Sequence, residues 1–213
     1  MSSSGGRAAL LAAVLVATLV AACSGAPDER VLPKEPTGPA VTYVALGGDD
    51  VSGGRRTFAS TWPHRLFRTA LPLTADLVDL SDPRSGIAQV RADQVDRAVA
   101  AKPALVTLTL LDDAERGSDP DGVGADLAAV LTALTARDAT RVLVGTVPDG
   151  SAAPAVVEGL NQAIRTTAAG RAHVRVVDLA TVGRADTADG ATRTAQAFAR
   201  AVRALGISPG RSP

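Results

Sequence analysis

The chain has 213 residues, of which 46% are hydrophobic and 2% aromatic, and its 22 basic residues balance its 22 acidic residues. This balance and the few aromatic rings argue against a nucleic-acid surface, which needs a basic stripe. The single cysteine excludes an intramolecular disulfide, and the two histidines exclude a three-histidine zinc site.

The first segment has the pattern of a secretory signal. Arg7 precedes an apolar run over residues 8–22, which as a helix of about 22 Å is shorter than the ~30 Å hydrocarbon core of a bilayer. The run ends in small residues before Cys23, the only cysteine of the chain. This arrangement resembles the lipobox of bacterial lipoproteins, which implies cleavage before Cys23 and its lipidation. The alternatives are an ordinary signal peptide cleaved near Ala22 and an uncleaved anchor.

The next segment predicts a tether. Residues 24–40 contain four prolines and no apolar period, a pattern typical of a semi-extended linker. We therefore divide the chain into a signal peptide (1–22), a lipidated cysteine with its tether (23–40), a domain (41–207) and a disordered tail (208–213). The expected location is the extracytoplasmic face of the cell membrane, held by a lipid anchor. The excess of arginine (20) over lysine (two) is typical of a GC-rich bacterial genome, such as that of an actinobacterium.

The domain alternates β-rich runs with helical patterns. The predicted strands are Val41–Leu46, Asp76–Leu80, Leu105–Leu111, Arg141–Thr146 and Val174–Leu179. The predicted helices are one that begins at Trp62, followed by Ile87–Ala101, Gly124–Arg137, Ala155–Ala169 and Gly190–Leu205. The alternation predicts a three-layer α/β/α fold with a five-stranded parallel sheet covered on both faces. Ligands of such sheets bind beyond the carboxyl ends of the strands, so we expect function there.

A glycine-rich turn follows the first strand and holds Asp49 and Asp50 between Gly47 and Gly54. The glycines have neither the dinucleotide-binding spacing nor the P-loop spacing, and no lysine follows them. Two aspartates would also repel a phosphate. We therefore expect no nucleotide and no other cofactor.

Several short motifs, in their order, resemble the SGNH (GDSL-like) hydrolase family. The segment from Tyr43 to Asp49 resembles the first block of that family, and Trp62-Pro63 resembles the start of its first helix. Residues 102–108 and 145–149 resemble its third and fourth strands. The resemblance runs from about Val41 to Leu205 and implies a flavodoxin-like topology. It also implies a serine nucleophile, a histidine base and an oxyanion hole made by a glycine and an asparagine.

The residues that would perform this chemistry are replaced here. The position of the serine holds Asp50, and the position of the asparagine in the third block holds Asp112. The glycine of the second block falls near Arg84 or, with a two-residue shift, at Gly86. The closing histidine aligns with Ala185. A carboxylate cannot simply replace an activated hydroxyl in acyl transfer. An ionised aspartate only accepts hydrogen bonds and repels a developing oxyanion. We therefore expect an inactive domain that binds a small molecule, a cell-envelope glycan or a partner.

The replaced positions allow two interpretations. Asp50, Arg84 and Asp112 follow adjacent strands, so they could form an ionic cluster in which the guanidinium offsets two carboxylates. Alternatively, Asp49, Asp50, Asp112 and Asp113 offer the oxygen ligands that Ca²⁺ or Mg²⁺ prefers. The metal site is the weaker interpretation, because paired aspartates at strand ends are also ordinary turn residues and helix caps.

A rearranged esterase is the remaining alternative. Ser52 lies two positions beyond the nucleophile position and would need His64 or His173 as its base. His64 falls at the start of the first helix, and His173 precedes the fifth strand, at the opposite edge of the sheet. For its partners we expect the membrane through the lipid anchor, no nucleic acid, and a monomeric state.

Overall fold

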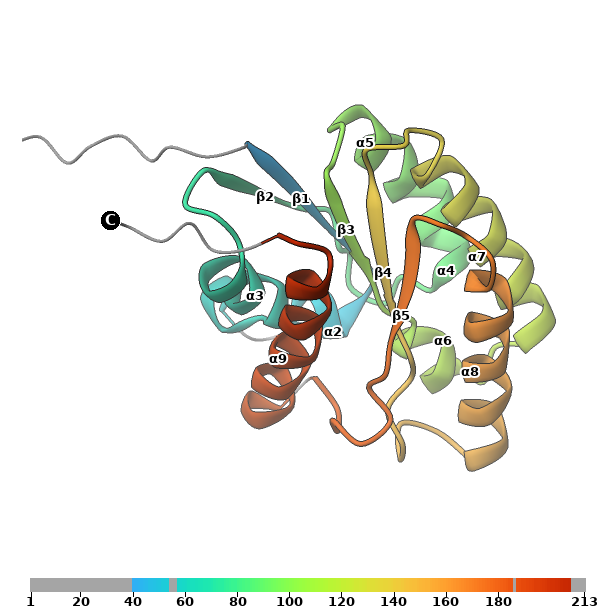
Figure 1. The fold of residues 1–213 in the computed structure, drawn as a ribbon. Coiled ribbons are helices and arrows are strands. Elements are labelled where there is room, and N and C mark those ends of the chain that lie inside the picture. The colour runs from blue at the N-terminus through green and yellow to red at the C-terminus, as the bar shows by residue number, and fades with distance from the viewer. Residues whose placement is uncertain (1–39, 54–56, 186, 208–213) are drawn as a thin grey trace, which may run out of the picture. The chain divides into compact units, whose positions relative to one another are not determined.

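A parallel sheet between two layers of helices forms the domain (Figure 1). The structure, a computed structural model, describes residues 40–53, 57–185 and 187–207. Its strands are β1 (Val41–Leu46), β2 (Ala75–Asp79), β3 (Leu105–Leu108), β4 (Arg141–Gly145) and β5 (Val174–Val177), in the order β2-β1-β3-β4-β5 with all neighbours parallel. The predicted fold class is confirmed. The signal peptide, Cys23, the tether and the tail lie outside the described residues.

The helices connect these strands. They are α2 (Asp49–Ser52), α3 (Trp62–Ala70), α4 (Ile87–Gln89), α5 (Val95–Ala100), α6 (Leu111–Arg116), α7 (Pro120–Leu134), α8 (Pro154–Ala168) and α9 (Ala188–Ala204), with a 3₁₀ turn η1 (Phe58–Ser60) and a π-helical turn η2 (Val90–Gln94). Side-chain caps start three of them: Thr61, Asp119 and Thr187 accept hydrogen bonds from the backbone N–H three residues later. None of the helices in the described part of the chain is long and apolar enough to cross a membrane.

Alternation along β1 shows how both faces of the sheet become core. Tyr43 and Ala45 pack into a cluster with α3 and α9, whereas Val44 and Leu46 pack into a second cluster with α5, α7 and α8. Figure 1 shows these two helix layers on opposite sides of the sheet. The continuous apolar runs of the sequence thus reflect strands that are buried on both faces.

Three elements differ most clearly from the sequence prediction. The third strand ends at Leu108 rather than Leu111, because the chain turns there and starts α6. The predicted helix Ile87–Ala101 contains the π-helical turn η2, whose last residue, Gln94, is buried. Helix α7 begins four residues before the predicted start, since Asp119 caps it and Pro120 occupies its first position.

The strand order places the point where the chain changes direction across the sheet between β1 and β3. The helix after β1 covers one face of the sheet, and the helix after β3 covers the other, so the chain departs in opposite directions from two adjacent strands. In open α/β sheets this topological switch point is where ligands bind. The segments that leave β1 and β3 here are α2 and α6, which contain two of the replaced positions, Asp50 and Asp112.

Candidate functional site

A hydrogen bond joins the turns that follow β1 and β3. The backbone N–H of Asp49 donates to Asp112 Oδ2 at 2.9 Å. Gly48 makes this approach possible, because any side chain at that position would overlap the Asp112 carboxylate and crowd the backbone oxygen of Ser85. The Asp112 carboxylate therefore lies against the segment that corresponds to the first block of the SGNH resemblance, and the N–H group next to the nucleophile position is already occupied.

Asp50 is enclosed by neighbouring elements. Its side chain is 5% exposed and lines a cavity of about 10 Å³ together with Thr109, Thr194 and Ala185. The cavity has room for about one water molecule. Asp50 Oδ1, Thr109 Oγ1 and Thr194 Oγ1 are buried and have no hydrogen-bond partner among the described residues. The nucleophile position is thus a closed polar pocket rather than an open cleft.

Burial makes both carboxyl groups weak acids. Burial, and to a smaller extent the nearby negative charge of Asp112, raise the pKa of Asp50 to about 7, while the Thr109 hydroxyl, close but outside hydrogen-bonding geometry, offsets part of the rise. Burial also raises the pKa of Asp112 to about 6, against the hydrogen bond from Asp49 N–H. Near neutral pH the Asp50 carboxyl therefore retains its proton for part of the time.

Asp113 has a structural role beside this pair. Its Oδ2 accepts from the backbone N–H of Ile87 at 2.8 Å, and its Oδ1 accepts from the Ser118 hydroxyl at 3.3 Å. Burial raises its pKa, and the Ile87 N–H and the Arg116 guanidinium oppose that rise. Asp113 therefore fixes the start of α4 against α6 and points away from Asp50.

The predicted ionic cluster is wrong in one member. Arg84 is exposed, and within the described ranges it forms no ion pair with Asp50 or Asp112. It occupies a turn at φ +64°, and its backbone oxygen accepts from Arg116 Nη1 at 2.7 Å, so the turn directs its side chain to solvent. Asp50 and Asp112 do lie near each other, since the charge of Asp112 raises the pKa of Asp50, but the guanidinium that opposes the raised pKa of Asp112 belongs to Arg116 and not to Arg84.

The metal interpretation finds no ligand set. Among residues 40–53, 57–185 and 187–207, His, Cys, Asp and Glu side chains form no group of three or more that could hold an ion. Asp112 is committed to the Asp49 N–H, and Asp113 is committed to Ile87 and Ser118. Two of the four aspartates singled out in the sequence are thus committed to other partners.

A hydrolase would need a base near the nucleophile position, and the candidates from the sequence are the segment at Ala185 and the two histidines. Ala185 lines the Asp50 cavity, so the segment aligned with the closing histidine does face the nucleophile position. Ser52 Oγ lies 3.5 Å from the Asp49 carbonyl at the end of α2. His64 packs its ring on Phe58, with 4.9 Å between centroids. His173 precedes β5, and its Nε2 lies 3.7 Å from Asp138 Oδ1 at the opposite edge of the sheet.

Two features of the site escaped sequence reasoning. Gln94 donates to the Gly47 carbonyl and accepts from the Gly47 N–H, both at 3.1 Å, and so fixes the turn after β1. Arg184 pairs with Glu115 at 2.6 Å and joins the loop that precedes α9 to α6. The polar type of Gln94 within an apolar helical pattern was the only signal for the first feature. The second depends on residues 69 positions apart and had no local signal.

Solved structures with the same fold are esterases and lipolytic proteins. The domain is similar to a lipolytic protein of the G-D-S-L family from Desulfitobacterium hafniense DCB-2, at 15% identity over 75% of this chain and 98% of that one, with a TM-score of 0.63. It is similar to TesA at 18% identity over 77% of this chain and 99% of that one, with a TM-score of 0.63. The domain is also similar to a catalytic mutant of Axe2, an acetylxylan esterase from Geobacillus stearothermophilus. The identity is 16% over 84% of this chain and 100% of that one, with a TM-score of 0.61.

No protein-family model and no curated protein matches the sequence. The structural likeness, at this level of identity, concerns the fold alone. The chain therefore has the α/β fold of SGNH hydrolases, and its chemistry has to be argued from the side chains at the ends of β1 and β3.

Proposed function

We propose that this chain is a lipid-anchored extracytoplasmic protein whose SGNH-hydrolase-like domain has no ester hydrolase activity and serves in binding a ligand or partner at the cell envelope. The observation that carries the proposal is the buried carboxyl pair. Asp50 occupies the nucleophile position inside a cavity of about 10 Å³, and Asp112 accepts the neighbouring Asp49 N–H.

Each step of serine ester hydrolysis lacks its group in this arrangement. The attacking atom would be a carboxylate oxygen, and attack on an ester would give a mixed anhydride instead of an ordinary acyl-enzyme. The position aligned with the base is Ala185, which has no group to accept a proton. The negative charge of the tetrahedral intermediate would form beside the Asp112 carboxylate, which repels it. The cavity is also too small to admit an acyl group.

The anchor part of the proposal rests on Cys23. A single cysteine at the end of a fifteen-residue apolar run, followed by a proline-containing tether, matches the lipobox pattern. Incorporation of labelled fatty acid into the chain expressed in a bacterial host, and its loss in Cys23→Ser, tests this part. Equal incorporation in both chains would contradict it.

An ester hydrolysis assay tests the inactive site. A chain that begins at Ser24, without the lipidated cysteine, and its Ser52→Ala variant should both hydrolyse short-chain nitrophenyl esters at the buffer rate. Ester turnover that disappears in Ser52→Ala would overturn the proposal in favour of a rearranged esterase. The triple variant Asp50→Ser, Asp112→Asn, Ala185→His restores the residue types of the family pattern, and turnover above the buffer rate in this variant alone would show that the replacements, not the scaffold, prevent catalysis.

A further inference from the structure

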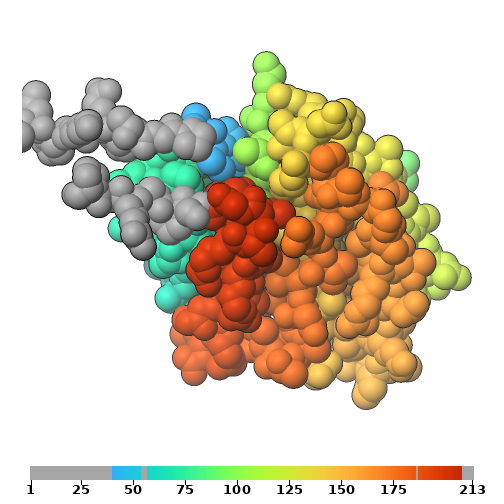
Figure 2. All heavy atoms as spheres, in the orientation of Figure 1, coloured from blue at the N-terminus to red at the C-terminus, as the bar shows by residue number. Residues whose placement is uncertain are grey.

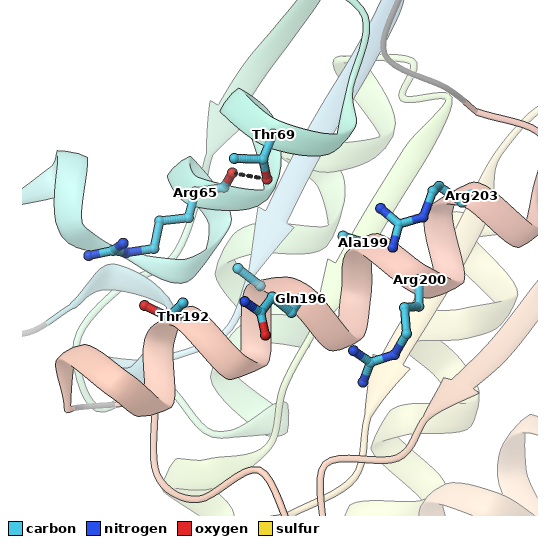
Figure 3. Close-up of a pocket in the computed structure, with 8 residues that line it drawn as sticks. Arg65, Thr69, Thr192, Gln196, Ala199, Arg200 and Arg203 are labelled. Carbon is cyan, nitrogen blue, oxygen red and sulfur yellow. Dashed lines mark hydrogen bonds between the residues drawn. The ribbon is translucent and has the colours of Figure 1, made fainter.

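A groove lies between α3 and α9, the two helices that pack on Tyr43 and Ala45 of the sheet (Figure 3). Its volume is about 480 Å³. The residues that line it are Arg65, Thr69, Thr192, Ala195, Gln196, Ala199, Arg200 and Arg203. It is therefore far larger than the Asp50 cavity, and its lining is basic and polar.

The arginines of this groove are not neutralised by the protein. Arg65, Arg200 and Arg203 form no ion pair with any acid in the part of the chain that the structure describes. In Figure 3, Arg65 lies near Thr192 at one end of the groove, and Arg203 lies at the other. Helices α3 and α9 together contain five arginines and a single acid, Asp189. A chain with no net charge thus concentrates positive charge on one helix pair.

Exposed apolar side chains flank the same helix. Phe58 precedes α3 and is 50% exposed, and Leu73 follows α3 and is 71% exposed. Large exposed apolar residues next to unpaired arginines are typical of surfaces that lie at a membrane interface, where rings and aliphatic groups enter the headgroup region and guanidinium groups bind phosphates. Neither Phe58 nor Leu73 lines the groove itself, so they would add contacts to a bilayer surface but not to a soluble anion inside the groove.

The position of the groove suits a tethered domain. Helix α9 runs back along the sheet, so its last turns, with Arg200 and Arg203, lie toward the edge where β1 begins at Val41 (Figure 1). Figure 2 shows α9, in red, at the molecular surface. From Cys23 the chain has 17 residues before Val41, which span at most about 60 Å when extended. The groove can therefore reach a membrane to which Cys23 is attached.

We infer that the α3/α9 groove, with Phe58 and Leu73, is a membrane-docking surface that binds the phosphate headgroups of anionic phospholipids. The inference deepens the proposed envelope function and rests on its extracytoplasmic, membrane-attached location. The fork of donors on each arginine matches phosphate oxygens. Docking holds the domain on the bilayer in one orientation and exposes the opposite helix layer to the envelope space.

Vesicle sedimentation tests this surface without the lipid anchor. The described core residues all lie between Val41 and Val202, so a chain from Ser24 keeps them all. This chain should bind vesicles of phosphatidylcholine mixed with phosphatidylglycerol, bind pure phosphatidylcholine weakly, and release at high salt. The double variant Arg200→Gln, Arg203→Gln should bind the mixed vesicles about 30-fold more weakly, since each surface arginine contributes about fivefold. Arg65 is left intact because its Nε donates to the Ser60 carbonyl.

The matched control changes the same charge elsewhere. Arg97→Gln, Arg137→Gln removes two exposed arginines outside the α3/α9 pair and should leave vesicle binding unchanged, with both variants melting as the parent does. Equal loss in both double variants, or no binding by the parent, would overturn the inference. Binding of soluble polyphosphate in the absence of vesicle binding would assign the groove to a soluble anion and overturn it as well. Because the chain lacks the anchor and esterase activity is not measured, none of these outcomes depends on the proposed inactive site.

Discussion

The carboxyl ends of the strands and the α3/α9 groove are opposites in charge and access. The first region holds two buried carboxyl groups, of which Asp50 lines a cavity of about 10 Å³, whereas the second presents three arginines around a groove of about 480 Å³. In open α/β sheets the first is where ligands are expected. Here it is a small closed cavity, which teaches that the strand ends of such a sheet need not offer a larger hollow than the outer helix layer.

The comparison depends first on the claim that burial makes the charged form of the Asp50 carboxyl unfavourable. Its folded pKa is raised from 3.8 to about 7, so the stability that its proton supplies is complete below the unfolded pKa and is lost as pH rises through about 7. Asp50→Asn removes this dependence. We expect the variant to be more stable than the parent at pH of about 8 by up to about 4 kcal/mol, and this gain should shrink toward about pH 4.

Urea denaturation across this pH range measures the difference. Comparison with the parent cancels the titration of the other carboxyl groups. Asp119→Asn, an exposed helix-capping aspartate, is the control for removal of a carboxylate charge. A variant that is less stable than the parent at the higher pH would show that Asp50 is ionised and paired in the fold.

The next effect concerns the two hydrogen bonds by which Gln94 fixes the turn after β1. Gln94→Leu removes two hydrogen bonds and leaves the N–H and carbonyl of Gly47 without this partner. The expected loss in unfolding free energy is about 2–4 kcal/mol. Gln162→Leu on the exposed side of α8 is the matched control and should change stability by less than about 0.5 kcal/mol. Similar losses in the two variants would show that the hydrogen bonds between Gln94 and Gly47 do not stabilise the turn.

The contact between Gly48 and Asp112 should give a comparable effect. Gly48→Ala forces the new methyl group against the carboxylate and should cost about 1–3 kcal/mol. In an Asp112→Ala background the same change should cost much less, because the carboxylate is gone. A double-mutant cycle in which the two losses simply add would place Asp112 away from Gly48.

The smallest effect belongs to the ion pair beside the cavity. Arg184 and Glu115 have side chains that are more than a third exposed, so Glu115→Ala should lower the unfolding free energy by at most about 1 kcal/mol. Asp126→Ala, which removes the Arg91 pair in the opposite layer, should behave alike. A loss well above that of Asp126→Ala would mean that the Arg184 pair holds the cavity closed.

Sequence patterns were sufficient where local chemistry decides the structure. Apolar runs covered on both faces identified the strands, and the parallel topology placed Asp50 and Asp112 at adjacent strand ends. The direction of Arg84 was not predictable, because it depends on a positive φ in a turn that most residues avoid. The α3/α9 groove was also invisible, since Arg65 and Arg203 are far apart in the chain and meet only when their helices pack on the same face.

The central claim is that the carboxyl ends of the strands hold no activated serine. Fluorophosphonate labelling tests this claim most directly. The chain from Ser24 would be incubated with the reagent and analysed by intact mass, with a serine esterase of known reactivity treated in parallel as the reference. The account predicts no added mass on this chain. A stoichiometric adduct that maps to Ser52 and is lost in Ser52→Ala would contradict it.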